Sequence, residues 1–344
     1  METKILREIN DESLSIAGKI IRDGGLVAFP TETVYGLGAD AYNDQAVKNI
    51  YVAKGRPSDN PLIVHIADVE DVIKVAREIP ENAKKLLEAY APGPFTIILK
   101  KQPTISNTVT AGLDTVGIRI PSDEVARAFL KAAKVPVAAP SANLSGKPSP
   151  TNAQHVIDDM NGRVDAIICG NESSVGVEST IIDLTEQVPT ILRPGGITLD
   201  DVISVCGCGR LDKHVLSSVS ADEQPKCPGM KYKHYAPDAE VTVVEGGRDK
   251  VVEKIKELLL KCSKDGKKTG VLAQEDFGFC TDLFISTGKD NVSFSGVLFK
   301  ALREFDKQGI DEVFVQFSIQ DSVGIAVKNR LYKSAGNNVI YVGE

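Results

Sequence analysis

Short apolar runs alternate with amphipathic stretches over the first two hundred residues. Six runs have the length and flanking residues of buried strands, because Gly, Pro or Asp bounds them and β-branched side chains are frequent in them. These runs are residues 26–29, 97–99, 116–120, 135–139, 167–168 and 181–182. Between them, residues 45–54 and 81–90 carry apolar side chains at helical spacing. The pattern therefore predicts an α/β domain.

The alternation stops at residues 217–238, where three prolines occur and no apolar periodicity is sustained. Such a segment is typical of a linker. The alternation then resumes, which indicates βαβ units and a small open parallel sheet. The strands expected there are residues 241–245, 271–272 and 313–317, and the helices are 251–259, 297–305 and 323–332. The predicted organisation is a first domain at 1–216, a linker at 217–238 and a second domain at 239–344.

Composition and charge narrow the class of protein. At 344 residues the chain exceeds the roughly 250–300 residues at which single cores stop growing, in agreement with two domains. No apolar run approaches the ~18 residues needed to span a bilayer, and the first ten residues lack a signal-peptide pattern, so no membrane partner and a cytoplasmic location are expected. The net charge of −7 argues against a broad nucleic-acid-binding surface but permits a local basic cleft.

Metal ligation is not predicted from the cysteines and histidines. Six cysteines are scattered along the chain, and the one close pair, Cys206 and Cys208, lacks the partner spacing of a zinc site. The four histidines are equally dispersed. Reduced thiols and no protein metal centre are therefore expected.

The segment PTETVYGLG at residues 30–38 follows a predicted strand with hydroxyls and glycines. Such groups at the end of a strand suit a small ligand, although an ordinary turn has the same composition. Gly36, Gly38 and Ala41 also satisfy the pattern G-x-G-x-x-A of dinucleotide-binding turns. That match is weak, because a segment containing proline separates the glycines from the strand.

Cations occur where structural elements are expected to end or to be buried. Lys54 and Arg56 flank a glycine at a helix end, where they would either hold a polyphosphate or complement the helix dipole. Arg193 ends an apolar strand as an edge residue or an anion ligand. Arg119 lies inside an apolar strand and must be paired, with a substrate carboxylate or with a structural Asp or Glu.

Small polar side chains fill the loop at residues 138–151, which leaves a predicted strand. Hydroxyl and amide groups with nearby backbone N–H groups suit phosphate or ribose oxygens, although surface loops share this composition. The chain has no G-x-x-x-x-G-K-[ST] sequence, so ATP would bind without a Walker loop.

Taken together and in this order, these segments closely resemble the YrdC-type threonylcarbamoyl-AMP synthases in their longer, two-domain form. The matching pieces between residues 24 and 237 are PTETVYGLG, KGRP with the following Asn60, PLIVHI, YAPGPFT, GIRIP, APSANLSG, VGVESTIID, ILRPGG and PGMKYKHYAP. The fold that this resemblance implies is a YrdC-like twisted mixed-sheet α/β domain with a concave basic cavity, followed by a smaller Rossmann-like α/β domain. The linker would act as a lid over the cavity.

The resemblance also implies roles for individual residues. Lys54 and Arg56 would be the catalytic cations that face the ATP phosphates, with Ser141 and Asn143 as the matching S-x-N pair. Further nucleotide contacts would come from Asn60, Thr115, Ser149, Arg193 and Tyr235. Contacts to L-threonine would come from Thr33, His65, Arg119, Ala139 and Ser179, with Arg119 on the carboxylate.

The implied reaction is that of a nucleotidyltransferase. It joins L-threonine, bicarbonate or CO₂ and ATP into L-threonylcarbamoyladenylate, with release of pyrophosphate, for N6-threonylcarbamoyladenosine modification of tRNA. Mg²⁺ would bind mainly through the ATP phosphates. A downstream tRNA threonylcarbamoyltransferase would receive the adenylate, and weak RNA binding would be compatible with the cavity.

Three other functions fit parts of the pattern. A YrdC-like module could bind RNA during ribosome or tRNA maturation without catalysis, but the chain has no Trp and few aromatic residues for base stacking. A carbamoyl-adenylate step in hydrogenase maturation would require zinc-finger cysteine pairs and an acylphosphatase region, and the chain shows neither. A dinucleotide reductase would rest on Gly36 and Gly38 alone.

Overall fold

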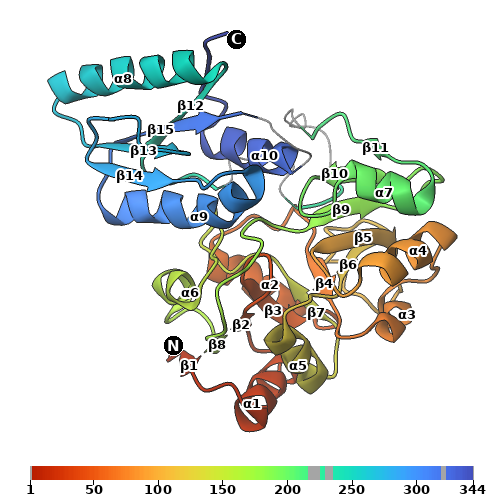
Figure 1. The fold of residues 1–344 in the computed structure, drawn as a ribbon. Helices are drawn as coiled ribbons and strands as arrows, with labels where there is room; N and C mark the ends of the chain where they lie inside the picture. Colours follow the sequence, from red (N-terminus) through yellow and green to blue (C-terminus); the bar gives the residue numbers. More distant parts are fainter. Residues whose placement is uncertain (1, 216–224, 229–234, 319–322, 344) are drawn as a thin grey trace. The chain divides into compact units, whose positions relative to one another are not determined.

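The computed structural model describes residues 2–215, 225–228, 235–318 and 323–343 (Figure 1). The chain forms two compact units, residues Met1–Ser145 with Ser149–Tyr232 and residues Gly146–Pro148 with Lys233–Glu344. Most of the predicted linker at 217–238 lies outside the described residues. No helix of the described part of the chain is long and apolar enough to cross a membrane.

A mixed sheet organises the first unit. Its described strands are β1 (Lys4–Leu6), β2 (Val27–Phe29), β3 (Gly36–Asp40), β4 (Ile63–His65), β5 (Phe95–Lys100), β6 (Thr115–Arg119), β7 (Val137–Ala139), β8 (Ala166–Ile168), β9 (Thr180–Asp183), β10 (Thr190–Arg193) and β11 (Arg210–Leu211). They are hydrogen-bonded in the order β1-β8-β2-β3-β7-β4-β6-β5-β9-β10-β11. The sheet contains parallel pairs, such as β4 with β6, and antiparallel pairs, such as β7 with β4. The six predicted strands correspond to β2, β5, β6, β7, β8 and β9.

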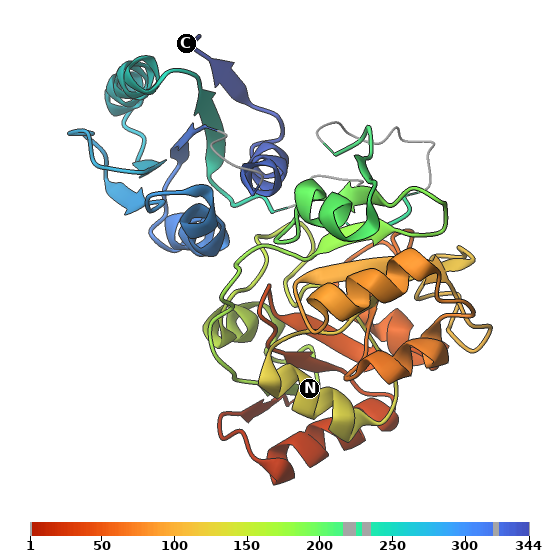
Figure 2. The same ribbon diagram turned by 45° about the vertical axis from the view of Figure 1, so that its right-hand side comes forward.

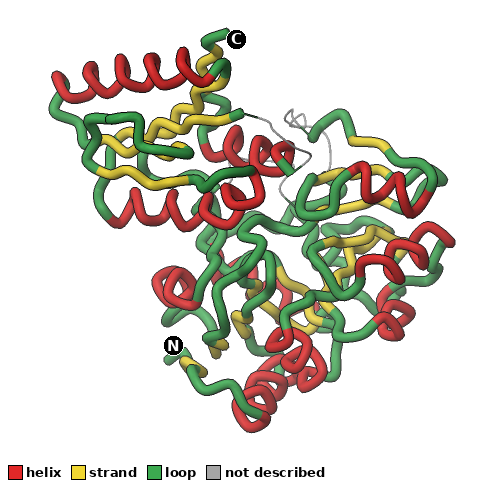
Figure 3. The backbone as a smooth tube through the Cα atoms, in the orientation of Figure 1, coloured by secondary structure: helices red, strands yellow, loops and turns green. Residues whose placement is uncertain are grey.

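Helices cover this sheet, as the ribbon and tube views show (Figures 1 and 3). They are α1 (Asp11–Arg22), α2 (Asp44–Lys54), α3 (Val72–Val75) with a short 3₁₀ turn η1 (Val69–Asp71) before it, α4 (Glu81–Tyr90), α5 (Glu124–Ala133), α6 (Ala153–Met160) and α7 (Leu199–Cys206). The predictions of helices at 45–54 and 81–90 are confirmed by α2 and α4. The apolar side chains of the sheet and of α2, α4, α6 and α7 form one large core, and those of α1 and α5 form a second.

The dinucleotide fingerprint suggested by Gly36 and Gly38 is wrong. Both glycines lie inside strand β3, which pairs with β2 and β7. They are therefore not at a strand-to-helix turn, where such a fingerprint must lie to bind a pyrophosphate. Their lack of a side chain serves packing, because a Cβ on Gly38 would lie 2.6 Å from a methyl carbon of Val137.

Helix α2 ends where the sequence pattern predicted. The Asn43 side chain accepts hydrogen bonds from the N–H groups of Gln45 and Ala46 at its start. Gly55 ends it with φ +61°, a conformation that favours glycine. This C-terminus fixes Lys54 as the last helical residue and turns the chain towards Arg56.

The second unit is a parallel α/β sheet, as the resemblance implied. Its described elements are β12 (Glu240–Glu245), α8 (Arg248–Lys264), β13 (Thr269–Ala273), β14 (Leu283–Ser286), α9 (Asn291–Lys307), β15 (Glu312–Phe317), α10 (Gly324–Ser334) and β16 (Val339–Tyr341). The strand order is β14-β13-β15-β12-β16, with parallel pairing throughout. Helix α8 lies on one face of this sheet, and α9 lies on the other (Figures 1 and 2). The predicted strands and helices of this region are confirmed, and β14 and β16 were not predicted.

Close packing of α1 on α5 yields a first testable outcome. A Cβ on Gly18 would lie 2.4 Å from the Ala132 carbonyl oxygen, which belongs to backbone and cannot move alone. We expect Gly18→Ala to destabilise the first unit by about 1–3 kcal/mol through overpacking. Urea unfolding measures this change, with tryptic cleavage within the first unit as the readout of its unfolding.

Gly296→Ala is the matched control, because no atom lies within 4 Å of a Cβ at that position in α9. It should leave the stability unchanged or raise it by up to about 1 kcal/mol, since Ala favours helix. Equal effects of the two substitutions would contradict close helix packing as the cause.

Candidate active site

The loop between β2 and β3, residues 30–35, joins segments that lie far apart in the sequence. The Tyr35 N–H donates a hydrogen bond to the Pro150 carbonyl at 2.9 Å. On the other side of the loop, the Glu32 carbonyl accepts the Val175 N–H at 2.8 Å. The loop thus fixes both the polar loop that follows β7 and the segment that precedes β9.

A buried ion pair anchors the same loop to β6. The Arg119 Nη2 lies 2.9 Å from the Glu32 Oε1 and donates to the Thr31 Oγ1 at 3.4 Å. The two charged side chains are only 5% and 7% exposed. The structural carboxylate partner that the sequence left open is therefore present, and it is Glu32.

This pair does not use all of the guanidinium. The Arg119 Nε is buried and has no hydrogen-bond partner among the described residues. A buried donor without an acceptor costs about 1–3 kcal/mol, so such groups commonly mark a place that a ligand fills. A substrate carboxylate is a suitable acceptor, because carboxylates accept from Arg in a fixed geometry.

His65 ends β4 and is paired in register with Arg119. Its Nδ1 lies 3.2 Å from the Ile63 carbonyl oxygen, and its ring meets the Phe29 ring edge-on at 5.7 Å. Burial, reinforced by the positive charge of Arg119, lowers the pKa of His65 to about 3. The imidazole is therefore neutral at physiological pH and offers hydrogen bonds without a charge.

The other three predicted threonine contacts are buried as well. The Thr33 Oγ1 lies 3.0 Å from the Thr31 Oγ1, next to the ion pair. Ala139 ends β7 opposite Ile63 of the same strand as His65. The structure thus brings Thr33, His65 and Arg119 together around the loop, and Ala139 is one strand away.

The predicted S-x-N pair is tied to the end of α2. The Lys54 Nζ donates to the carbonyl oxygens of Ser141 and Asn143, both at 2.5 Å. The Ser141 Oγ donates to the Asn143 Oδ1, also at 2.5 Å. Lys54 is 3% exposed, so its ammonium holds this loop in place. Its contact with phosphate stays a prediction.

Arg56 and Asn60 follow along the same stretch. Arg56 lines an open cavity of about 620 Å³ together with Tyr51. Asn60 is 1% exposed, and its Oδ1 accepts no hydrogen bond within the described part of the chain. Thr115 begins β6. Because β4 and β6 are parallel, Thr115 lies at the same end of the sheet as the start of β4, which follows Asn60. Asn60 and Thr115 therefore lie at the same end of two paired strands.

The segment that precedes β9 contacts residues predicted to bind the nucleotide and contains a residue predicted to bind threonine. The Ser149 Oγ donates to the Glu178 Oε1 at 2.6 Å. The adjacent Ser179 accepts hydrogen bonds from Arg193, at 3.0 Å to its carbonyl oxygen and 3.2 Å to its Oγ. The Ser179 Oγ also lies 2.8 Å from the Thr96 Oγ1. Arg193 is thus buried and holds Ser179 in place through hydrogen bonds. The interpretation of Arg193 as an edge residue is wrong.

Tyr235 belongs to the second unit, where its ring packs on Phe299 at a centroid distance of 5.1 Å. Its φ of +65° is unusual for a residue with a side chain. The prediction that it contacts the nucleotide stays a prediction.

Sequence reasoning missed Glu32, Thr31 and Glu178. All three are buried polar residues that position predicted site residues. The signal for Glu32 was present, because a carboxylate flanked by threonines after an apolar strand is a candidate partner for the cation inside another strand. Its distance in sequence from Arg119 hid the pairing.

Two family models match the chain. The model of Sua5, YciO and YrdC domains, described as "Telomere recombination", matches residues 19–195. The model described as "Threonylcarbamoyl-AMP synthase, C-terminal domain" matches residues 197–336.

Full-length relatives agree with both models. The threonylcarbamoyl-AMP synthase of Pyrococcus abyssi is 46% identical over 98% of each chain. The threonylcarbamoyl-AMP synthase of Bacillus subtilis is 44% identical over 96% of this chain and 95% of its own. The crystal structure of P. abyssi Sua5 complexed with L-threonine matches with a TM-score of 0.94 and 47% identity, over 99% of this chain and 100% of that one.

The lowered pKa of His65 predicts a pH dependence of stability. The pKa is about 3 in the folded chain against an ordinary value of 6.5, so the unfolded chain binds the proton more readily. The stabilisation is present above pH 6.5 and is lost progressively as the pH falls towards 3. In His65→Gln, which has no proton to bind, stability should decline less steeply over this range. Urea midpoints between pH 7 and pH 4 measure the difference, and parallel curves would contradict the assignment.

Replacing Lys54 should loosen the loop that it holds. In Lys54→Met the carbonyls of Ser141 and Asn143 lose a charged donor, which should cost about 1.5–3 kcal/mol of folding free energy. Lys48→Met is the control on the same helix, since its exposed pair with Asp44 contributes little. Chemical denaturation measures both, and equal losses would show that the buried contacts do not hold the loop.

Proposed function

Because the chain belongs to the threonylcarbamoyl-AMP synthase family, we propose that it makes L-threonylcarbamoyladenylate and pyrophosphate from L-threonine, bicarbonate or CO₂ and ATP. The observation that carries the proposal is the similarity over nearly the whole chain to relatives named as synthases. The reaction would be that of a nucleotidyltransferase and the first step of N6-threonylcarbamoyladenosine formation in tRNA.

The threonine site of this proposal is built around Arg119. Its unsatisfied Nε would donate to the substrate carboxylate, while Glu32 holds the opposite side of the guanidinium. His65 is neutral and Thr33 is buried beside the pair, so both suit the hydroxyl or amine of threonine. Burial strengthens each of these contacts, since the local dielectric is low. That P. abyssi Sua5 was crystallised with L-threonine supports threonine as the amino acid.

The nucleotide site would lie along the loops that follow α2 and β7. Arg56 would neutralise phosphate charge, and Lys54 would fix the Ser141 to Asn143 loop so that its polar groups face the ligand. The orphaned Asn60 Oδ1 would accept a hydrogen bond from the nucleotide. Ser149, held by Glu178, would supply a further contact.

Chemistry at this site needs no covalent protein intermediate. The threonine amine, once deprotonated, forms a C–N bond to CO₂ and becomes N-carboxythreonine. A carboxylate oxygen of that group then attacks the α-phosphorus of ATP, and the bond to the β-phosphate bridging oxygen breaks to release pyrophosphate. Both electron-pair donor and leaving group come from the reactants. The protein would therefore act by positioning and by neutralising charge.

Mg²⁺ is part of the proposal as a companion of ATP. Within the described residues, no group of three or more His, Cys, Asp or Glu side chains is placed to hold a metal ion. The side-chain oxygens of Ser149 and Glu178 are of the type that Mg²⁺ prefers. These two residues would therefore supply the few protein ligands of the ion. The ion would take most ligands from the phosphates and lower their repulsion towards the attacking oxygen.

The product also defines a partner. An acyl-adenylate is prone to hydrolysis, so a tRNA threonylcarbamoyltransferase would have to take it up promptly. The names of the relatives favour this enzymatic function over an RNA-binding module without catalysis. Weak contact with RNA stays a prediction.

Incubation of the purified chain with L-threonine, bicarbonate, Mg²⁺ and α-labelled ATP tests the function. Chromatography should show a labile labelled adenylate and one equivalent of pyrophosphate, both dependent on threonine. Pyrophosphate release without threonine, or no adenylate under any condition, would refute the proposal.

The Arg119 assignment predicts a selective defect. Arg119→Ala should raise the KM for threonine far more than that for ATP, because a charge-assisted contact of about 2–4 kcal/mol is lost. The substitution also leaves the buried Glu32 charge without its partner, which threatens the fold.

The double variant Arg119→Met with Glu32→Gln is the control, since it removes both buried charges. It should fold and still show the threonine defect. Glu32→Gln alone keeps the cation with a neutral partner, so it should weaken threonine binding less than the double variant does. Equal changes in the KM values for threonine and ATP would contradict the assignment of Arg119 to the threonine carboxylate.

A further inference from the structure

In the sheet of the second unit, the connections that follow two neighbouring strands run towards opposite edges of the sheet. After β13 the chain proceeds to β14 at one edge, whereas after β15 it passes through α10 to β16 at the other. β13 and β15 are adjacent. In open parallel sheets, a crevice forms outside the carboxyl ends of two strands whose connections diverge, and ligands bind there.

A cavity of about 190 Å³ lies at this point. Its lining comes from the carboxyl ends of β12, β13, β14 and β15, as the topology requires. Sites that enclose a drug-sized ligand begin at about 300 Å³, so this cavity would enclose one ring system and leave the rest of a ligand at its mouth. Neither the reaction proposed above nor the first unit uses it.

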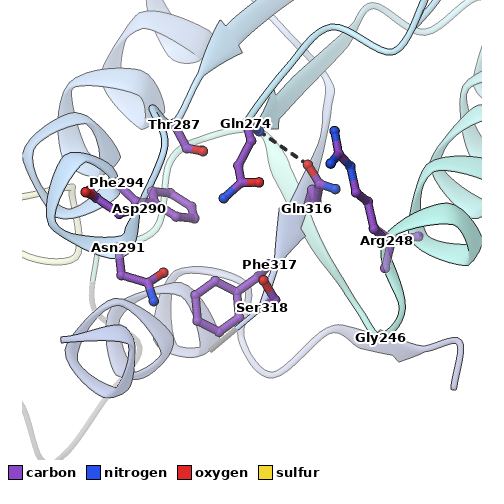
Figure 4. A pocket seen from close by; sticks show the side chains of 11 residues that line it. Gly246, Arg248, Gln274, Thr287, Asp290, Asn291, Phe294, Gln316, Phe317 and Ser318 are labelled. Atoms are coloured by element: carbon purple, nitrogen blue, oxygen red, sulfur yellow. Dashed lines mark hydrogen bonds between the residues drawn. The ribbon is translucent and has the colours of Figure 1, made fainter. Parts of the chain in front are cut away.

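The polar lining includes three carboxamides, those of Gln274, Asn291 and Gln316. In Figure 4 the Gln274 side chain projects into the space bounded by Thr287, Asn291 and Gln316. Thr287 and Asn291 are 2% and 4% exposed, so the floor is built from ordered, buried groups. The rings of Phe294 and Phe317 complete the lining with flat apolar surface.

Two amides present unused hydrogen-bonding groups. The Gln316 Oε1 accepts the Gln274 backbone N–H at 3.3 Å, which leaves its Nε2 without a partner in the described part of the chain. The Gln274 Nε2 donates to the Lys289 carbonyl at 3.4 Å, and its Oε1 has no partner there. The Gln316 Nε2 and the Gln274 Oε1 thus offer one donor and one acceptor, which complement adenine, whose N7 accepts and whose N6 donates. Guanine presents two acceptors at the same edge, so it fits less well.

The start of α8 offers groups that attract an anion, although Asp290 lines the same cavity and Asp249 lies in the first turn of α8. Helix α8 begins beside it at the glycine pair Gly246 and Gly247, and no described side chain caps its first turn. A helix N-terminus with uncapped N–H groups attracts phosphate. Arg248 adds a cation at the same place, although its Nη2 is 3.0 Å from the Glu275 carboxylate, which phosphate would have to displace.

We propose that the carboxyl edge of the β12–β15 sheet is a second nucleotide site, which binds an adenine mononucleotide with its base between the Gln274 and Gln316 amides and its phosphate at the start of α8. The assignment rests on the geometry of the second unit alone and is independent of the synthase reaction.

Photolabelling of the full chain with 8-azido-AMP, followed by peptide mapping, tests the site. Label should appear on peptides that contain residues 274–294 or 316–318, and excess AMP should suppress it at least about tenfold more effectively than GMP. Gln274→Met and Gln316→Met keep the side-chain length but remove the amides, and each should reduce this label about tenfold, as expected for lost base contacts. Gln308→Met is the matched control, since that exposed glutamine directly follows α9 and its Nε2 donates to Glu304.

Each outcome decides the matter. Label confined to peptides of the first unit overturns the proposal, as does equal protection by AMP and GMP. Unchanged labelling in both Gln→Met variants also overturns it. If a variant fails to fold, the AMP-against-GMP comparison on the unaltered chain still decides.

Discussion

The buried ion pair between Glu32 and Arg119 is the interaction on which the proposed site depends. Each charge would be costly in a dry interior, and each is tolerated because the other is 2.9 Å away. The pair fastens the loop after β2 to the end of β6 and thereby sets the position of Thr33 and of the remaining guanidinium donors. Burial and the positive charge of Arg119 lower the pKa of the neighbouring His65, so Arg119 affects both the geometry of the site and the protonation of His65. Replacing either partner alone disturbs this geometry, and replacing Arg119 also removes a charge that lowers the pKa of His65.

Backbone hydrogen bonds connect the loop that this ion pair holds to other segments of the proposed site. The loop at residues 30–35 holds the polar loop before α6 through Tyr35 and the approach to β9 through Glu32. Lys54 contributes by donating hydrogen bonds to the loop that carries Ser141 and Asn143. Groups proposed to bind two different substrates are thus parts of one connected network. Such connection suits a reaction in which catalysis consists mainly of holding two reactants in register.

Much of this arrangement could be predicted from the sequence, and the exceptions share a cause. Six buried strands, the end of α2 and the unusual position of Arg119 were evident, because apolar periodicity and a cation in a strand are local signals. The buried strands β3 and β4 were not predicted. The identity of Glu32 as the partner was not, since the strand order is not sequential and pairing across it leaves no local trace. Strands β14 and β16 were missed because they are short and only partly buried, which weakens their apolar pattern. The carbonyl partners of Lys54 were equally hidden, because backbone acceptors have no sequence signature.

The position of β8 also bears on how the chain is made. This strand lies between β1 and β2, and both pair with it in parallel. While a ribosome is still adding the residues between β2 and β8, the emerging chain contains two apolar strands whose shared neighbour does not yet exist. Their edges stay open until residue 168 has left the exit tunnel, and unpaired edges invite association with other chains. Synthesis of the first unit therefore has a vulnerable interval, during which chaperones would be the natural protection.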